Sequence, residues 1–362
     1  MIRRFYADNF RCLVNFEFRP ERVNLILGRN GSGKSTLFDA LRAVVQHLTG
    51  TSPQTTFPVD SLPWWEVRRQ QTFELDLTDE KNPDADFSYR LVVKHSEKDP
   101  PIIVEERLKQ GGKAVLEFAN GTLVLPGLNK GIPFDGKQSA LSLGLGQQQG
   151  GLQLFLSQVN QLLVFRLNPW AMELSAREEE RMLWVSGNNL VAFLRSWSQS
   201  DPEAYVGWKK RVLAGMPYLE DIQLRELLPG SRILAGMRHV AGRELLLSLS
   251  NFSEGERTLI ALQAIAGLAG EQRVIALDEP DNFLAPSEVQ PVLRLFTLTP
   301  PSGSTSQLFV ITHHPGSIDY LASYATWLFE REEDGFSRIR KLSFDQSDGE
   351  RPTDSLLAEL SV

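Results

Sequence analysis

The chain contains Gly28-Arg29-Asn30-Gly31-Ser32-Gly33-Lys34-Ser35-Thr36, a complete G-x-x-x-x-G-K-[ST] motif. An apolar run at residues 23–27 precedes the motif, and a helix-like stretch at residues 37–48 follows it. A strand, a glycine-rich loop and a helix in this order are what a phosphate-binding loop requires, and a chance match lacks that context. We therefore predict an α/β fold that binds a nucleoside triphosphate.

The residue types of the loop explain this chemistry. Its glycines let the backbone curl, so that successive N–H groups point at phosphate oxygens. The helix that begins there adds the positive end of its dipole. We expect Lys34 to reach the β- and γ-phosphates, and the Ser35 hydroxyl to bind Mg²⁺.

Length and composition restrict the class of protein. The 362 residues suffice for one large α/β domain with insertions, or for two domains. The net charge of −7 does not suggest a dedicated nucleic-acid coat, although a local basic face is compatible with it. The single cysteine, Cys12, excludes an internal disulfide framework and fits a reducing compartment. Neither a signal peptide nor an apolar stretch of roughly 20 residues is evident. We expect a soluble, cytoplasmic protein with no membrane partner.

Periodicity divides the chain into three parts. Residues 1–145 are expected to hold the phosphate loop and an antiparallel meander. The meander strands are indicated by alternating apolar residues at 72–77, 87–93, 102–108, 114–118 and 122–125, with turns at Gly111-Gly112 and Asn120-Gly121. Residues 146–220 are expected to be a mainly helical insert, because helical spacing recurs at 152–163, 176–184, 189–197 and 202–215. Residues 221–362 are expected to return to the nucleotide core, after a hairpin-like stretch at 222–228, 233–240 and 244–248.

A second apolar strand, at residues 274–277, ends in the adjacent carboxylates Asp278 and Glu279. An Asp at the end of a buried strand suits a ligand of Mg²⁺, and the following Glu can orient and deprotonate an attacking water. Two acids after a strand also arise by accident.

Upstream, Ser253 could cap a helix, and Gly255 could allow close approach to a phosphate. On its own this segment favours the simpler interpretation, a helix with Glu256 completing a capping box.

A third apolar strand, at residues 309–311, is followed by Thr312 and His313. A lone histidine after a strand is usually structural. Because His313 is the fourth element after the phosphate loop, Ser253 and Asp278, it becomes a candidate sensor of the γ-phosphate.

This ordered set resembles the ABC-type ATPases, and more narrowly their soluble SMC-like, RecF-like and OLD-like branch. The resemblance identifies residues 28–36 as Walker A, 253–257 as the signature, Asp278-Glu279 as Walker B with the catalytic glutamate, and His313 as the switch histidine. Asn9-Phe10-Arg11 is similar to a motif near the N-terminus of repair and chromosome-maintenance ATPases. Residues 185–190 are similar to a G-x-N-L motif in the helical insert of RecF-like ATPases. The implied fold is an ABC-type head with an antiparallel β subdomain and a mainly helical insert.

The sequence also departs from that family pattern. Glu254 replaces a small residue of the signature, and Ala285 replaces a frequent histidine. No Q-loop glutamine is obvious, and Gln71 and residues 147–149 are the candidates. Too few residues follow Ser343 for a Toprim nuclease domain, so cleavage of DNA by that route is not expected.

The resemblance implies that two heads enclose two ATP molecules, so that ATP joins a homodimer. Lys34, Glu279 and His313 would be catalytic, Ser35 and Asp278 would hold Mg²⁺, and Ser253 and Gly255 would act on the nucleotide of the partner. Arg11 would lie near the base or the dimer face. The implied nucleotide contacts are Asn30, Gly31, Ser32, Gly33, Lys34, Ser35, Thr36, Ser253 and Gly255.

Three functions remain open at this point. The leading one is a dimeric ATPase in DNA maintenance or anti-phage defence, which controls a separate effector protein. DNA is a possible partner, since basic spots occur at residues 3–4, 68–69, 209–211 and 338–341, although solvated surface charge is the commoner explanation. The alternatives are a nucleotide-binding subunit of a membrane transporter and an ATP-gated scaffold with little hydrolysis. The long interval between Lys34 and Ser253 disfavours the transporter subunit, and the presence of Asp278 and Glu279 disfavours the scaffold with little hydrolysis.

Overall fold

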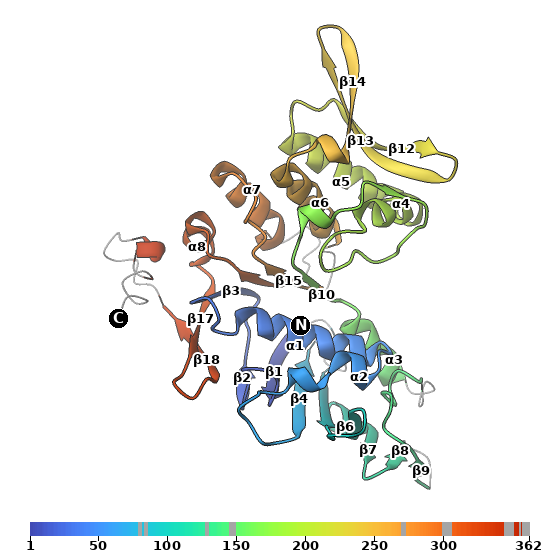
Figure 1. Ribbon diagram of the computed structural model, residues 1–362, viewed down its shortest axis with the longest axis vertical. Helices are drawn as coiled ribbons and strands as arrows, with labels where there is room; N and C mark the ends of the chain where they lie inside the picture. Colours follow the sequence, from blue (N-terminus) through green and yellow to red (C-terminus); the bar gives the residue numbers. More distant parts are fainter. Residues whose placement is uncertain are drawn as a thin grey trace.

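The structure is a computed structural model that describes residues 1–78, 82, 86–126, 130–144, 150–268, 273–298, 306–343, 351–354 and 356 (Figure 1). Its centre is a six-stranded sheet in which all strands but the last are parallel. In spatial order the strands are β10 (Leu162–Phe165), β15 (Val274–Asp278), β16 (Gln307–Ile311), β3 (Val23–Gly28), β17 (Ala325–Arg331) and β18 (Ser337–Leu342). The expected α/β fold is confirmed.

Both faces of this sheet are covered, which explains why β3, β15 and β16 are buried at every position. Ile26 and Phe309 face a core shared with α1 (Lys34–Leu48) and the antiparallel sheet. Leu25 and Val310 face a second core with α6 (Glu254–Leu268), α7 (Pro286–Thr297) and α8 (Pro315–Leu321). Figure 1 shows α1 on one side of the sheet and these three helices on the other. The phosphate-loop helix and the signature helix are therefore in different layers.

The expected meander is confirmed as part of an eight-stranded antiparallel sheet. Its strands, in spatial order, are β2 (Phe16–Phe18), β1 (Ile2–Asp8), β4 (Gln70–Leu77), β5 (Phe87–Lys94), β6 (Ile102–Gln110), β7 (Lys113–Ala119), β8 (Thr122–Val124) and β9 (Ile132–Pro133). Both predicted two-residue turns have positive φ at both positions, as a type I′ hairpin turn requires. Between α1 and β4, the chain forms two short helices, α2 (Pro53–Thr56) and η1 (Val59–Ser61).

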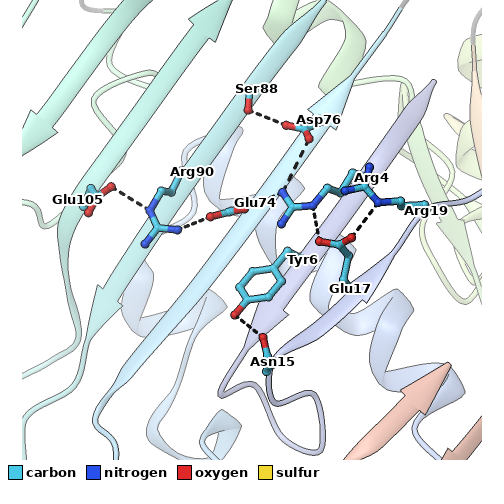
Figure 2. Close-up of polar contacts among 10 residues, drawn as sticks. All are labelled: Arg4, Tyr6, Asn15, Glu17, Arg19, Glu74, Asp76, Ser88, Arg90 and Glu105. Carbon is cyan, nitrogen blue, oxygen red and sulfur yellow. Dashed lines mark hydrogen bonds and ion pairs between the residues drawn. The ribbon is translucent and has the colours of Figure 1, made fainter. Parts of the chain in front are cut away.

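The polar face of this sheet carries alternating cations and carboxylates (Figure 2). Arg4 lies 2.7 Å from both Glu17 and Glu74. Arg90 also pairs with Glu74, and its Nε lies 2.9 Å from Glu105. Partly exposed pairs of this kind add little stability each, but they leave the face with no excess of positive charge.

Residues 146–220, which were expected to form a mainly helical insert, contain both helices and strands in the part that the structure describes. The structure has α3 (Gly150–Val159), α4 (Leu190–Ser200) and α5 (Pro202–Gly215), and the last two correspond to the helical spacing at 189–197 and 202–215. However, Leu162–Phe165 forms β10 and pairs with β15 in the parallel sheet. A short apolar run is compatible with either a helix or a buried strand, and here the neighbouring strand decides. We therefore propose that the insert begins after Phe165.

The helix predicted at residues 176–184 is wrong. Residues Ser175–Ala176 form the short strand β11, which pairs with β13, and bends follow. Arg195 on α4 donates hydrogen bonds to the carbonyl oxygens of Arg177 (2.6 Å) and Ala176 (3.4 Å). These are carbonyl groups that a helix would use internally, so a tertiary contact overrides the local helix propensity.

The hairpin-like stretch after the insert is confirmed. It consists of β12 (Asp221–Leu228), β13 (Ser231–Val240) and β14 (Arg243–Ser248), all antiparallel. In Figure 1 this arm projects from the helices of the insert. The short helix η4 (Leu249–Asn251) then leads directly into the signature segment.

Acid should destabilise the fold through His47, a fully buried residue of α1 whose ring contacts that of Phe57. Burial lowers the pKa of His47 to about 4, below its unfolded value near 6.5. Because the pKa of His47 is lower in the folded state, the contribution of His47 to the free energy of unfolding is complete above about pH 6.5 and is lost as the pH falls towards 4. His47→Phe should reduce that acid-induced loss by about 3 kcal/mol, measured by urea unfolding at pH 7, 5 and 4. The control is His239→Phe at an exposed histidine; equal pH profiles for His47→Phe and wild type would contradict the prediction.

Candidate nucleotide-binding site

The parallel strands place four chemically distinct segments at one edge of the central sheet. Arg166 follows β10, Asp278 ends β15, His313 follows β16, and the phosphate loop follows β3. Ligands of α/β proteins bind at this carboxyl edge. A pocket of about 300 Å³ lies there, lined by Cys12, Asn30, Gly31, Gly33, Lys34, Ser35, Thr36, Glu279 and His313. The structure thus brings the phosphate loop, Glu279 and His313 together.

Close contacts with β18 and the N-terminal segment hold the phosphate loop in its curled form. Gly33 has φ +105°, and a Cβ there would lie 2.3 Å from Ser337 Oγ and 2.8 Å from Cys12 Sγ. The Ser337 hydroxyl donates a hydrogen bond to the carbonyl oxygen of Ser32 (2.6 Å). Ser32 Oγ itself is buried and has no hydrogen-bond partner in the part of the chain that the structure describes. A buried polar atom without a partner and a glycine cradle both fit a bound phosphate.

Lys34 is almost completely buried beneath this loop. Its ammonium group donates hydrogen bonds to the carbonyl oxygens of Gly28 (2.7 Å) and Arg29 (3.0 Å). Burial lowers the pKa of Lys34, and the nearby carboxylates of Glu279 and Asp278 oppose that shift. The ammonium group is therefore already at the loop, where it can exchange carbonyl oxygens for phosphate oxygens.

Glu279 is held in a strained conformation at the mouth of the pocket. Its φ of +51° is in the left-handed region. This backbone conformation costs free energy in any residue other than glycine, and residues that adopt it are concentrated at functional sites. Its N–H donates to the Ile311 carbonyl oxygen (2.8 Å), and Asn282 donates to its carboxylate (2.6 Å). Its Oε1 lies 3.9 Å from His313 Nε2. The Glu279 carboxylate is therefore fixed beside the histidine.

The loop that carries His313 is tied to the Walker B segment by Asp281, a residue that the sequence analysis did not single out. The hydroxyl of Thr312 donates to Asp281 Oδ2 (2.6 Å), and the hydroxyl of Ser317 donates to the same oxygen. Burial, and then the positive charge of Lys34, lower the pKa of His313. The His313 imidazole is therefore neutral at neutral pH and can donate one hydrogen bond. The signal in the sequence was a further acid, two residues after Glu279.

Asp278 and Ser35 supply the oxygen donors that Mg²⁺ prefers. Asp278 is 4% exposed, at the carboxyl end of β15, and Ser35 lines the pocket. In this structure Arg166 contacts the Asp278 carboxylate through two of its nitrogens. Nothing in the local sequence of Arg166 marks it, so the sequence did not predict this contact with Asp278.

The signature segment does not line this pocket. Ser253 is exposed, and its hydroxyl donates to Glu256 Oε2 (2.9 Å) and accepts from the Glu256 N–H (3.3 Å). The capping box that the sequence favoured is therefore present. Gly255 is needed for packing, because a Cβ there would lie 2.5 Å from the carbonyl oxygen of Phe283. Gly255 is in the first turn of α6 and Ser253 directly precedes that helix, in the layer opposite α1.

Other predicted residues have local roles. Arg11 lies beside α1, where it pairs with Asp39 (2.6 Å). Gln71 is fully buried, and its amide donates to the carbonyl oxygens of Asn9 (3.0 Å) and Ser61 (3.1 Å), so it does not face the pocket. The alternative glutamines at 147–149 lie outside the described residues.

Gly33→Ala should disrupt the loop, because its methyl group would collide with Ser337 and Cys12. We expect a loss of ADP affinity of at least about tenfold, measured by calorimetry with Mg²⁺, because both overpacking and backbone strain oppose the native loop. Gly31→Ala is the matched control, since φ is also positive there but nothing lies within 4 Å of the added Cβ. Equal affinities for the two variants would contradict this explanation.

Comparison with known proteins gives a consistent picture. Residues 4–165 match a family model described as "AAA domain", and residues 178–319 match one described as "AAA domain, putative AbiEii toxin, Type IV TA system". No curated protein matches the sequence. Among solved structures, the SMC head domain from Thermotoga maritima is similar, with 15% identity, 95% of this chain and 99% of that chain covered, and a TM-score of 0.49. Both halves of the chain are therefore similar to AAA domains, and together the two matches support a P-loop ATPase.

Proposed function

We propose that this protein binds Mg²⁺·ATP at the carboxyl edge of its parallel sheet and hydrolyses it. The observation that carries the proposal is the pocket in which the phosphate loop with Lys34 meets Glu279 and His313. A phosphate cradle, a candidate base and a hydrogen-bond donor are the parts that phosphoryl transfer to water needs. The match to AAA domains supports the same conclusion.

Each side chain has a distinct role in this proposal. Lys34 and the loop N–H groups hold the phosphates, and Asn30 contacts the γ-phosphate. Glu279 orients the attacking water and accepts its proton, while His313 donates a hydrogen bond to the γ-phosphate. Ser35 and Asp278 would hold Mg²⁺, which neutralises charge on the phosphate oxygens. Catalysis then consists of positioning and charge stabilisation.

We propose further that Ser253 and Gly255 act on the nucleotide of a second copy. Support comes from their location, because α6 and the phosphate loop are in different layers and Ser253 is exposed. ATP would then join two heads, and it could favour the closed dimer only by binding that state more tightly than the open one. Hydrolysis would remove the difference.

The dimer would control a separate effector protein, in anti-phage defence or in DNA maintenance. The description of the second family model, which names an AbiEii toxin and a type IV TA system, supports an effector. Direct binding of DNA has less support, because all four basic segments contain residues paired with acids: Arg4 with Glu17, Arg68 with Asp8, Lys209 with Asp221 and Arg340 with Glu330. Within the described ranges, no helix is both long and apolar enough to cross a membrane. The cytoplasm remains our proposed compartment.

Glu279→Gln should lower ATP turnover by about 100-fold or more, because the variant cannot accept the proton of the attacking water. Binding should persist, so that ATP-bound dimers accumulate and appear in a mass measurement with Mg²⁺·ATP. Glu288→Gln is the control, since Glu288 caps α7 at the Ala285 N–H and an amide oxygen can replace it. Unchanged turnover in Glu279→Gln would contradict the catalytic role and favour the scaffold alternative.

Ser253→Arg should abolish turnover and leave ATP binding by the monomer intact, because the added side chain would block only the contact with a second copy. Turnover and calorimetric affinity are measured on the same preparation. If ATP binding disappears together with turnover, the signature does not act in trans.

A further inference from the structure

The side chain of Arg166 forms an ion pair with the carboxylate of Asp278. Arg166 Nε lies 2.6 Å and its Nη2 2.5 Å from Asp278 Oδ2. The Asp278 side chain is 4% exposed, whereas the Arg166 side chain is 49% exposed. The guanidinium group therefore reaches from the solvent side to a buried anion, which is costly to leave without a counter-ion.

The same carboxylate is the one that the proposed function assigns to Mg²⁺. A guanidinium group and a divalent cation repel each other, and both require the oxygen atoms of one small group. Arg166 and Mg²⁺ cannot occupy Asp278 Oδ2 together. Metal binding at Oδ2 would therefore move a side chain that is already hydrogen-bonded there, and metal binding at Oδ1 would place Mg²⁺ against the same guanidinium group.

The backbone beside Arg166 leads to the signature helix. The Arg166 N–H donates to the Val185 carbonyl oxygen (2.8 Å), and the Asn168 N–H donates to that of Ser186 (2.9 Å). The carbonyl oxygen of Pro169 accepts a hydrogen bond from Arg257 Nη1 on α6 (3.2 Å). Arg257 also donates to the Phe252 carbonyl oxygen (3.0 Å), next to Ser253. A continuous set of contacts thus joins Asp278 to the signature.

We propose that Arg166 is a positioning residue that acts through Asp278: it holds this carboxylate in the absence of metal, and Mg²⁺·nucleotide displaces it. Its release reaches the signature helix through residues 166–169. This inference rests on the proposed function, since it assumes that Asp278 is a metal ligand.

The test compares wild type with Arg166→Ala by calorimetric titration of ADP at graded Mg²⁺ concentrations. ADP is the probe because it lacks the γ-phosphate, so a new contact between the freed guanidinium and that group cannot enter the result. The Mg²⁺ concentration that gives half-maximal enhancement of ADP binding should fall about three- to tenfold, the size expected for a partly exposed ion pair. ADP affinity without Mg²⁺ should stay within about twofold of wild type.

Stability without ligand provides a second readout. Arg166→Ala leaves the buried Asp278 without its counter-ion, so its melting temperature should fall, and Mg²⁺·ADP should raise it more than it raises that of wild type. Arg90→Ala is the matched control, because Arg90 is similarly exposed and paired with two carboxylates on the antiparallel sheet (Figure 2). This control should not change the dependence on Mg²⁺.

Two further variants keep the test decisive if Arg166→Ala does not fold. Arg166→Lys retains the charge and should restore most of the wild-type Mg²⁺ requirement, whereas Arg166→Gln should resemble Arg166→Ala. Hydrogen exchange at residues 185–188 and 254–258 should change on addition of Mg²⁺·ADP in wild type but not in Arg166→Gln.

The outcomes separate the two proposals. If wild type binds ADP and the Mg²⁺ requirement is the same in wild type, Arg166→Ala and Arg166→Gln, the role of Arg166 is overturned and the proposed function stands. If wild type binds no ADP at any Mg²⁺ concentration, both are overturned.

Discussion

The site depends on the parallel pairing of β3, β15 and β16, because parallel strands bring all their carboxyl ends to one edge. The strands are far apart in the chain, so this pairing alone brings the phosphate loop to Glu279 and His313. Each strand must be apolar on both sides, since separate cores cover the two faces of the sheet. The polar residues Asn24 and Gln307, near the amino ends of β3 and β16, are buried and hydrogen-bonded internally, whereas Glu279 and His313 lie beyond the carboxyl ends and line the pocket. The position of the polar side chains of the site therefore follows from the burial of the parallel strands.

A second constraint is the tightness of the connections around that edge. Gly33 leaves no room for a methyl group, Glu279 has a left-handed backbone, and two hydroxyl groups share one oxygen of Asp281. The left-handed backbone of Glu279 costs free energy locally and persists only where the surrounding structure determines it. The signature segment is different, because its capping box needs only Ser253 and, in the first turn of α6, Glu256, and would form in any helix with the same first turn. Preorganisation is therefore concentrated at the phosphate loop and Walker B.

The sequence predicted those parts of the fold whose signals are local. The phosphate loop, the meander turns and helix α5 were predicted correctly, and α5 is defined by Asp201, which caps it at the Ala204 N–H (3.0 Å), and by the proline that follows. The errors have tertiary causes. β10 is a strand because β15 lies beside it. The predicted helix at 176–184 does not begin, because Ala176 pairs with β13 and Arg195 bonds the carbonyl groups of Ala176 and Arg177. Arg166 and Asp278 are 112 residues apart, and no local pattern links two such positions. The roles of the site residues in hydrolysis stay predictions.

The alternating charges on the antiparallel sheet also affect how this molecule meets others. Cations and carboxylates that lie about 3 Å apart cancel each other's field within a few ångströms, and salt screens the remainder over about 8 Å at physiological ionic strength. A face of this kind does not accelerate the approach of a polyanion from a distance. A partner would be recognised there only after contact, by shape and hydrogen bonding, at an association rate that changes little with salt.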